Sequence, residues 1–337
     1  MRTAPSFAHI AAMTDGYGTF EHASHAVPRR EHGYCTDDVA RLLVVATREP
    51  DPSTLVRQLA RGALRFVADA QGVTGRSRHR RDVGGRGPGR RTVEDCWGRS
   101  LWGLGTAAVH GDGRLATDAL AVFEHGTGQR SPHPRAMAFA ALGAAAVASV
   151  YPAHPQARAL LHDAAEVIDA RGTGSGWPWP EPRLTYANAA LPDALLAAGA
   201  ALDRPALVER GLELLGWLLD RETTDGHLSV TPAGGAGPHD RGPGYDQQPI
   251  EVATLADACA RAVGLTGADR WAEGVRMAAA WFDGDNDSGA VMWDSFTGGG
   301  YDGLEATGPN ENQGAESTLA LISTLQQARA IDALIPA

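Results

Sequence analysis

The chain has 337 residues, of which 43% are hydrophobic and 21% are charged, as is ordinary for a globular protein. Its formal net charge of −10 argues against a general nucleic-acid-binding protein, because such proteins usually present a basic face. Apolar runs are all shorter than the roughly 18 residues that a membrane-spanning helix needs, so we expect no membrane partner. The three cysteines are far apart in the sequence and residues 1–12 lack the apolar core of a signal peptide, which favours a reducing, cytoplasmic location.

The sequence contains one kind of helix that is apolar all round. Alternating runs of β-branched residues are scarce, whereas alanine and leucine dominate, which favours helices over strands. Segment 136–146 is apolar on every side, and segments 187–201 and 254–263 nearly so. Such helices must be buried all round. In chain order, we expect helices of this kind to begin near Thr36, Glu94, Pro134, Thr185, Gln248 and Gly314.

Helices of a second kind lie between the buried ones. Segment 208–219, for example, places charged residues on one face and leucines on the other, as in a helix that is half exposed. We expect such helices at Ser53–Ala70, Gly113–His125, His154–Ala170, Arg204–Arg221 and Asp269–Asp283, with Pro5–Met13 as a short twelfth helix. Buried helices that alternate with half-exposed ones describe an inner ring inside an outer ring. The sequence therefore predicts an all-α (α/α)6 barrel, a six-hairpin toroid, formed by residues 1–337 as one domain.

Polar residues gather just before the buried helices or in their first turns. In a toroid these ends converge on one mouth, so we expect a single pocket there. Four carboxylates are predicted to be catalytic: Asp38, Asp95, Glu181 and Glu251. Other residues of the same clusters suit the polar edges and apolar faces of a sugar ring and are predicted to bind substrate: Asp37, Trp97, Arg99, Trp179, Tyr186, Asn188, Asp246, Gln247, Gln248, Tyr301, Asp302, Glu305, Asn312, Gln313 and Glu316.

Each of these residue types also has a structural role that the sequence leaves open. Acids in the first turn of a helix cap free N–H groups, and Glu251 is placed to close a capping box. Tryptophans such as Trp97 also serve as packing residues. On the catalytic interpretation, one carboxylic acid protonates the leaving oxygen of a glycoside and a second carboxylate activates water on the opposite face.

The sequence predicts neither a metal site nor a cofactor. The 12 histidines form no HxxxH pair among the acidic clusters, and segment 285–289 lacks the later glutamate of a calcium loop. The glycines at 298–300 are not placed between a strand and a helix, which argues against a nucleotide site. The basic segment 76–91 is interpreted as a solvated loop, with phosphate binding as the alternative.

Five ordered motifs resemble a bacterial family often labelled glycosyltransferase or glycosidase. Its members tend to accompany retaining glycosyltransferases and mannoside phosphorylases, so the resemblance implies a carbohydrate context that includes mannosides. The chain shows no alternation of strands and helices of the Rossmann type, which argues against a nucleotide-sugar transferase domain. The motifs run over nearly the whole chain, at residues 33–38, 94–99, 184–188, 246–249 and 312–318.

These observations favour an inverting glycoside hydrolase that acts on an oligosaccharide. A sugar 2-epimerase is an alternative, although the motifs of the buried helices are poor in the histidines that such chemistry uses. A phosphorylase is a further alternative, with Arg99 or the basic segment as the phosphate ligand. A terpenoid-cyclase toroid would need few amides in its pocket, which the glutamines and asparagines contradict. A non-catalytic carbohydrate-binding domain also remains open, and the sequence does not address the oligomeric state.

Overall fold

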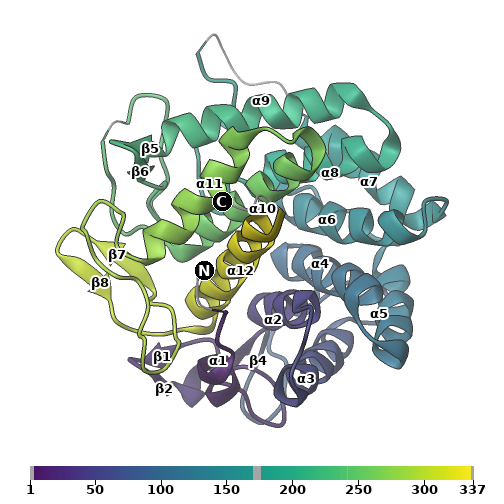
Figure 1. Cartoon of the computed structure of the whole chain (residues 1–337). Coiled ribbons are helices and arrows are strands. Elements are labelled where there is room, and N and C mark those ends of the chain that lie inside the picture. Colours follow the sequence, from purple (N-terminus) through teal and green to yellow (C-terminus); the bar gives the residue numbers. More distant parts are fainter. Residues whose placement is uncertain (1–3, 170–175, 241, 335–337) are drawn as a thin grey trace.

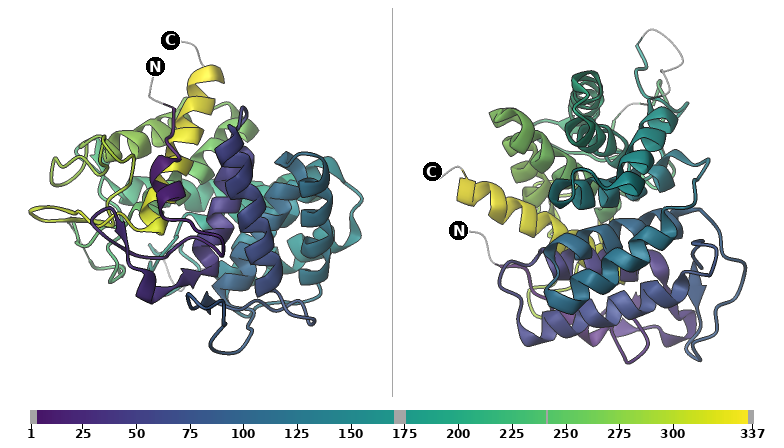
Figure 2. Two further views of the ribbon diagram at one scale, coloured as in Figure 1. Left: turned by 90° about the horizontal axis from the view of Figure 1, so that it is seen from below. Right: turned by 90° about the vertical axis from the view of Figure 1, so that its right-hand side faces the viewer.

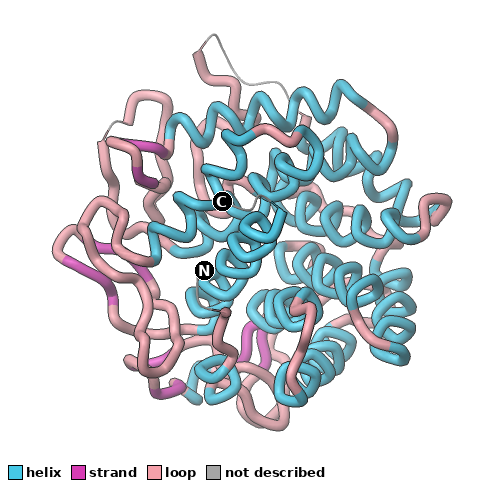
Figure 3. The backbone as a smooth tube through the Cα atoms, in the orientation of Figure 1, coloured by secondary structure: helices cyan, strands magenta, loops and turns pink. Residues whose placement is uncertain are grey.

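The computed structural model describes residues 4–169, 176–240 and 242–334. Two concentric rings of helices make up most of this part of the chain (Figures 1 and 3). Each inner helix packs against the next around a closed ring, and the last packs against the first. In ring order, the inner helices are α2 (Thr36–Arg48), α4 (Asp95–His110), α6 (Pro134–Val150), α8 (Ala190–Leu202), α10 (Pro249–Thr266) and α12 (Ala315–Leu334).

The outer helices each pack against an inner helix and cover the outside of the ring. They are α3 (Thr54–Ala70), α5 (Gly113–Gly126), α7 (Pro155–Ile168), α9 (Pro205–Arg221) and α11 (Asp269–Phe282). The twelfth position holds only α1 (Ala8–Ala12), a helix of five residues that packs against α12. The predicted (α/α)6 barrel is confirmed, and the two classes of helix alternate as the hydrophobic pattern indicated.

Short β-hairpins and strand pairs lie in the connections between the helices. Four pairs of antiparallel strands are present in the described part of the chain. They are β1 (Ala23–Ser24) with β2 (Val27–Pro28), β3 (Tyr34–Cys35) with β4 (Arg80–Arg81), β5 (Thr223–Thr224) with β6 (His227–Leu228), and β7 (Gly303–Glu305) with β8 (Gly308–Asn310); a 3₁₀ turn spans Arg30–His32. The β3–β4 pair ties the start of α2 to the connection between α3 and α4, because Cys35 pairs with Arg80.

Helix starts follow the chemistry of the first turn. Proline occupies the first helical position of α6, α7, α9 and α10, where its missing N–H needs no partner. The largest departure from prediction is α8, which begins at Ala190 and not at Thr185. Ala187 adopts a left-handed conformation with φ of +46°, so residues 185–189 form a turn before the helix. The predicted end of the third outer helix, Ala170, lies outside the described residues.

The inner helices α4 and α6 approach one another more closely than ordinary side chains allow. Gly105 faces the backbone of Gly143, and Gly143 in turn faces the carbonyl oxygen of Leu101. A β-carbon added at either glycine would overlap the neighbouring backbone. Nearly all the remaining positions of α6 between residues 135 and 148 are also buried, and most of them are alanines. Small residues therefore set the distance between these two helices.

The two ends of the barrel differ. Figure 2 shows the C-terminal end of α12 at one end of the ring, while the long connection between α3 and α4 lies at the opposite end. The N-terminal ends of the inner helices gather near that second end, together with the hairpins. In the described part of the chain, no helix combines the length and the apolar character needed to cross a bilayer.

We predict that Gly143→Ala destabilises the protein by about 1–3 kcal/mol, because the added methyl group forces the α4 and α6 backbones apart. Chemical denaturation followed by circular dichroism measures the change. Gly264→Ala is the matched control, since Gly264 is exposed on α10 with open space around its α-carbon. That variant should be as stable as the wild type or slightly more stable. Equal stability of Gly143→Ala and the wild type would contradict this account of the packing.

Candidate active site

Two adjoining cavities open at the mouth of the barrel and share Asp37 and His79. The first has a volume of about 380 Å³ and the second about 390 Å³. The first is lined by Asp37, His79, Glu94, Asp95, Cys96, His133, Pro134, Arg135, Glu181 and Tyr186. The second is lined by Glu21, His22, Cys35, Asp37, Asp38, Arg41, His79, Asp246, Gln248, Pro249, Asp302, Asn310, Gly314, Glu316 and Ser317. Cavities of this size suit a small-molecule ligand.

Arg41 joins two acids of the second cavity. Its guanidinium is buried and donates to the carboxylate of Asp38 at 2.6 Å and to that of Glu316 at 2.5 Å. Asp38 and Arg41 lie one turn apart on α2, whereas Glu316 comes from the first turn of α12. Burial alone would raise the pKa of Glu316, but the positive charge of Arg41 outweighs it and holds that pKa below its usual value. Glu316 is therefore held as a carboxylate at the cavity wall.

Arg99 lies beneath two acids of the first cavity. Its guanidinium is 3.5 Å from the carboxylates of both Asp37 and Asp95, and it stacks on Phe139 at 4.2 Å from the ring centre. The hydroxyl of Tyr186 donates to Asp95 at 2.9 Å. Burial and the nearby negative charge of Asp95 raise the pKa of Tyr186, so its hydroxyl stays protonated as a donor. Asp37 keeps one buried carboxylate oxygen, Oδ1, that accepts no hydrogen bond.

Arg135, at the second position of α6, organises the opposite wall of the first cavity. It donates to both carboxylate oxygens of Glu181, at 2.7 and 2.8 Å, and to the side-chain oxygen of Asn188 at 3.0 Å. Its Nε also donates to the carbonyl oxygen of Tyr186, and its guanidinium lies 4.9 Å from the centre of that ring. Both carboxylate oxygens of Glu181 are therefore held by one guanidinium nitrogen, Nη1, which fixes the position of the carboxylate.

Asp246 is a carboxyl group of the mouth whose surroundings oppose ionisation. Its Oδ1 is buried without a hydrogen-bond partner, and it lies directly beside the α-carbon of Gly303. Burial, followed by the negative charges of Glu305 and Asp302, raises the pKa of Asp246 to about 6. Asp302 itself accepts hydrogen bonds from the hydroxyl of Ser317 at 2.6 Å and from the backbone N–H of Gly314 at 2.8 Å.

Some predicted site residues stabilise the backbone behind the cavities and do not line them. Glu251 is buried and accepts from the backbone N–H groups of Ala187 and Asn188 and from the Asn188 side chain. Gln247 is fully buried, accepts from the indole N–H of Trp281 and donates to Asp287. The remaining amides make similar local bonds: Gln313 to Thr297 and Asp294, and Asn312 to Asn310 and the backbone of His25.

The two tryptophans that the sequence offered as sugar-stacking surfaces are packed inside the protein. Trp97 is fully buried and donates its indole N–H to the carbonyl oxygen of Gly126. Trp179 is also fully buried and stacks on Trp217. Tyr301 is half buried against the core, and Glu305 is exposed beside Asp246, outside both cavities. Tyr186 is the aromatic residue that lines the cavities among the described residues.

The predicted residues that the structure brings to the two cavities are Asp37, Asp38, Asp95, Glu181, Tyr186, Asp246, Gln248, Asp302 and Glu316. Sequence reasoning missed Arg41, Arg135, His79 and His133 as members of this group. A signal existed for Arg135, because it occupies the same first-turn position as the acids of the other inner helices. His79 gave no such signal, since it lies in the basic segment and reaches the mouth only through the β3–β4 pairing.

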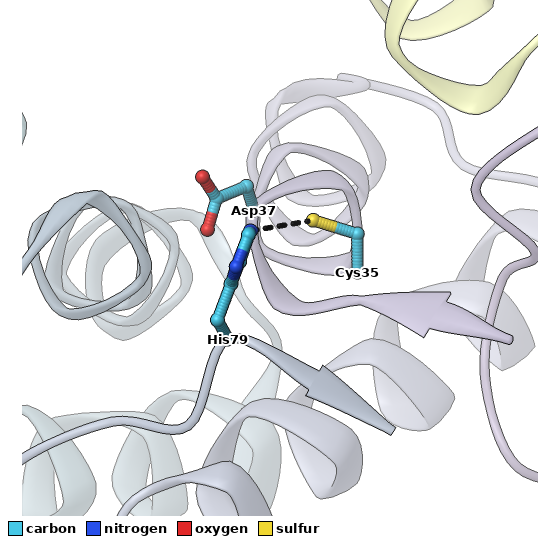
Figure 4. Close-up of side chains that lie close together, drawn as sticks. All are labelled: Cys35, Asp37 and His79. Carbon is cyan, nitrogen blue, oxygen red and sulfur yellow. Dashed lines mark hydrogen bonds between the residues drawn. The ribbon is translucent and has the colours of Figure 1, made fainter. Parts of the chain in front are cut away.

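One cluster at the junction of the two cavities combines three kinds of metal ligand. The thiol of Cys35, a carboxylate oxygen of Asp37 and an imidazole nitrogen of His79 lie within 4.8 Å of one another (Figure 4). The Cys35 sulfur is 3.5 Å from Nε2 of His79. Burial, together with the charges of Asp38 and Asp37, raises the pKa of Cys35, so the free thiol is a poor nucleophile.

Comparisons with known proteins support the fold. No protein-family model matches the chain, and no curated protein matches its sequence. Among solved structures, a sugar epimerase from a ruminal bacterium superposes with a TM-score of 0.71 at 11% identity, covering 96% of this chain and 95% of that one. The cellobiose 2-epimerase of Spirochaeta thermophila gives 0.68 at 12% identity over 96% and 93%. A cellulase of C. cellulolyticium in complex with cellobiose gives 0.65 at 9% identity over 96% and 89%.

These similarities define the class of protein at the level of its fold. The chain is an (α/α)6 barrel, with polar residues collected at the end of the barrel where the inner helices begin. At sequence identities of 9–12%, these superpositions support a shared architecture and nothing more.

We predict that Glu251→Gln lowers the free energy of unfolding by about 1–3 kcal/mol, because one carboxylate oxygen that accepts N–H groups becomes an NH₂ group that faces them. Urea denaturation measures the change. Glu166→Gln, an exposed change on α7, is the control and should leave stability within about 0.5 kcal/mol of the wild type. A neutral Glu251→Gln would show that its hydrogen bonds to residues 187 and 188 contribute little.

Proposed function

We propose that the protein is a carbohydrate-active enzyme that hydrolyses a glycosidic bond by acid–base catalysis between two carboxyl groups of the second cavity. The observation that carries this proposal is the contrast between Asp246 and Glu316 in one cavity. Asp246 has a buried oxygen with no hydrogen-bond partner, whereas Glu316 is paired with the guanidinium of Arg41. Two carboxyl groups whose surroundings favour opposite protonation states are suited to the roles of acid and base.

In this mechanism, Asp246 is the general acid. It donates its proton to the glycosidic oxygen as the bond from that oxygen to the anomeric carbon breaks. Glu316 is the general base and removes a proton from a water molecule, whose oxygen then bonds to the anomeric carbon from the opposite face. The products are two sugars, the anomeric configuration is inverted, and both carboxyl groups return to their starting states by proton exchange with solvent.

The remaining acids are assigned to substrate binding. Asp38 accepts a hydrogen bond from Arg41, Asp95 accepts one from Tyr186, and both carboxylate oxygens of Glu181 accept from Nη1 of Arg135. Each is therefore held in a fixed orientation and keeps lone pairs to accept hydrogen bonds from sugar hydroxyl groups. Gln248 adds an amide at the wall of the second cavity. Glu251 supports the turn at residues 187–188 and takes no chemical step.

Sugar epimerisation is the second candidate, and the histidines at the mouth favour it. His22, His79 and His133 line the two cavities, although none lies within an inner helix. Two of the superposed barrels are sugar epimerases. An epimerase would remove the proton at C2 of a sugar and return it to the other face. Incubation with mannose, glucose and cellobiose in D₂O separates the candidates, because only epimerisation places deuterium at C2.

We expect Asp246→Asn and Glu316→Gln each to lower kcat by about 100- to 10,000-fold on manno- or gluco-oligosaccharides that the wild type cleaves. The loss follows because neither amide can transfer a proton. Initial rates by reducing-sugar release measure it, and proton NMR of the first product reports its anomer. Asp118→Asn, exposed on α5, and Glu166→Gln are matched controls that should keep wild-type rates. Retained turnover in both cavity variants would overturn the hydrolase proposal.

The pH dependence of kcat/KM should reflect the ionisation of Asp246 and Glu316. Asp246 must be protonated to act as an acid, so the rate should fall as the pH rises through about 6. Glu316 must be ionised, and Arg41 lowers its pKa, so the acidic limb should lie below the usual glutamate range. Charged groups that face Asp246 are Glu305 and Asp302. Glu305→Gln should therefore shift the basic limb to lower pH, whereas an unmoved limb would contradict the assignment of Asp246.

A further inference from the structure

We propose that Cys35, Asp37 and His79 form a binding site for one divalent transition-metal ion of the zinc type at the junction of the two cavities. Two segments supply the three residues: Cys35 ends β3 and Asp37 lies in the first turn of α2, which follows directly, whereas His79 directly precedes β4. The sequence separates His79 from the other two by more than 40 positions, which is why no ligand spacing was visible there.

The spacing of the ligand atoms fits a tetrahedral ion. Zinc–sulfur and zinc–nitrogen bonds of about 2.3 and 2.05 Å at a tetrahedral angle place the sulfur and nitrogen atoms about 3.5 Å apart. The Cys35 sulfur and Nε2 of His79 are 3.5 Å apart in the structure. The carboxylate of Asp37 also lies within 4.8 Å of both atoms. Figure 4 shows Cys35 and Asp37 on the segment that runs from β3 into α2, with His79 beside them on the segment that leads to β4.

Asp37 is the acid near the Cys35 thiol whose carboxylate makes no hydrogen bond to an arginine among the described residues. Glu21 and Asp38 also lie near the Cys35 thiol, but Arg80 holds Glu21 at 2.5 Å and Arg41 holds Asp38 at 2.6 Å. Asp37, by contrast, lies 3.5 Å from Arg99 through Oδ2 without a hydrogen bond to it. Its buried Oδ1, like Oε2 of Glu21, accepts no hydrogen bond. A buried carboxylate oxygen without a donor is stabilised by coordination to a metal ion.

The charge around the cluster favours a cation. Six carboxyl groups line the second cavity, and Arg41 is the guanidinium that lines it among the described residues. Arg80 and Arg99 contact two of these acids from outside the lining, which still leaves fewer positive than negative groups. These negative charges attract a divalent ion, which binds sulfur as the thiolate.

The donor set defines the class of metal. A thiolate and an imidazole select zinc and its neighbours, whereas calcium and magnesium prefer oxygen ligands alone. Three protein ligands leave a fourth position, as in zinc sites that also hold water or substrate. Cys35, Asp37 and His79 all line the second cavity, so this position is open to it. The proposal goes beyond glycoside hydrolysis and does not depend on it, because it concerns metal binding in the absence of any sugar.

The test is a metal titration of the full-length protein after treatment with a chelator. Zn²⁺ is titrated by calorimetry and by competition with a chromophoric chelator, and Co²⁺ is added in parallel as a spectroscopic probe. We expect one equivalent of each ion to bind, and Co²⁺ to give the near-ultraviolet charge-transfer band of a cobalt–thiolate bond together with the visible bands of tetrahedral cobalt. Ca²⁺ and Mg²⁺ should not compete.

Variants locate the site. Cys35→Ser should abolish the cobalt–thiolate band. Both Cys35→Ser and His79→Ala should weaken Zn²⁺ binding by more than about tenfold, because loss of a group that only supports a ligand already weakens metal binding by about that factor. Cys259→Ser is the matched control, since Cys259 is buried in α10 away from the cavities, and it should bind metal as the wild type does. His79 is exposed, so His79→Ala gives a test even if Cys35→Ser fails to fold.

Two results would overturn the proposal. One is a wild-type protein that binds no Zn²⁺ or Co²⁺ above the level of an exposed surface histidine. The other is a bound ion whose affinity and spectrum are the same in His79→Ala as in the wild type. Neither result bears on glycoside hydrolysis, which is tested by the variants of Asp246 and Glu316.

Discussion

The close approach of α4 to α6 is the constraint on which the rest of the barrel depends. Gly105 and Gly143 let two helix backbones touch, and the alanines of α6 keep the inner ring narrow on either side of that contact. A narrow ring brings the first turns of neighbouring inner helices within reach of one another's side chains. The cavities at the mouth are therefore a product of small residues deep in the wall, at positions that line neither cavity.

Three buried arginines convert this proximity into a defined site. Arg41 bridges α2 and α12, Arg99 lies between acids of α2 and α4, and Arg135 joins α6 to the turn that precedes α8. Burying a guanidinium is costly, and such pairs often add little to stability over apolar packing. What they do provide is orientation, because each arginine fixes the direction in which one or two carboxylates face the cavity. The arrangement thus favours a precise mouth over a maximally stable one.

The fold was predictable because it depends on repeated patterns, whereas the site depends on single contacts. Apolar runs such as 136–146 admit only a buried helix, and the amphipathic segments between them leave only an outer position. Acids at helix starts were correctly expected near the mouth for Asp38, Asp95 and Glu316, since convergence of helix ends follows from the ring itself.

Individual side chains were harder to place. Trp97 and Glu251 are of residue types that sugar-binding sites use. In the structure, Trp97 packs into the core and Glu251 accepts hydrogen bonds from a turn. No local sequence pattern distinguishes these structural roles from sugar binding. His79 lies at the site because the two-residue strands β3 and β4 pair with each other. The position of His79 depends on a pairing between two strands that are distant in the sequence. Strands of two residues are too short to show a periodic hydrophobic pattern. Positions of this kind require the three-dimensional structure.

The bond between Arg41 and Glu316 joins residues that are 275 positions apart. Gln326 adds a hydrogen bond to the backbone of Val45 along the same seam, at a separation of 281 positions. During synthesis, α2 and its charged first turn leave the ribosome long before α12 does. The nascent chain must therefore carry an open ring, with a guanidinium that still faces water, until the closing helix emerges and the mouth forms in a late step.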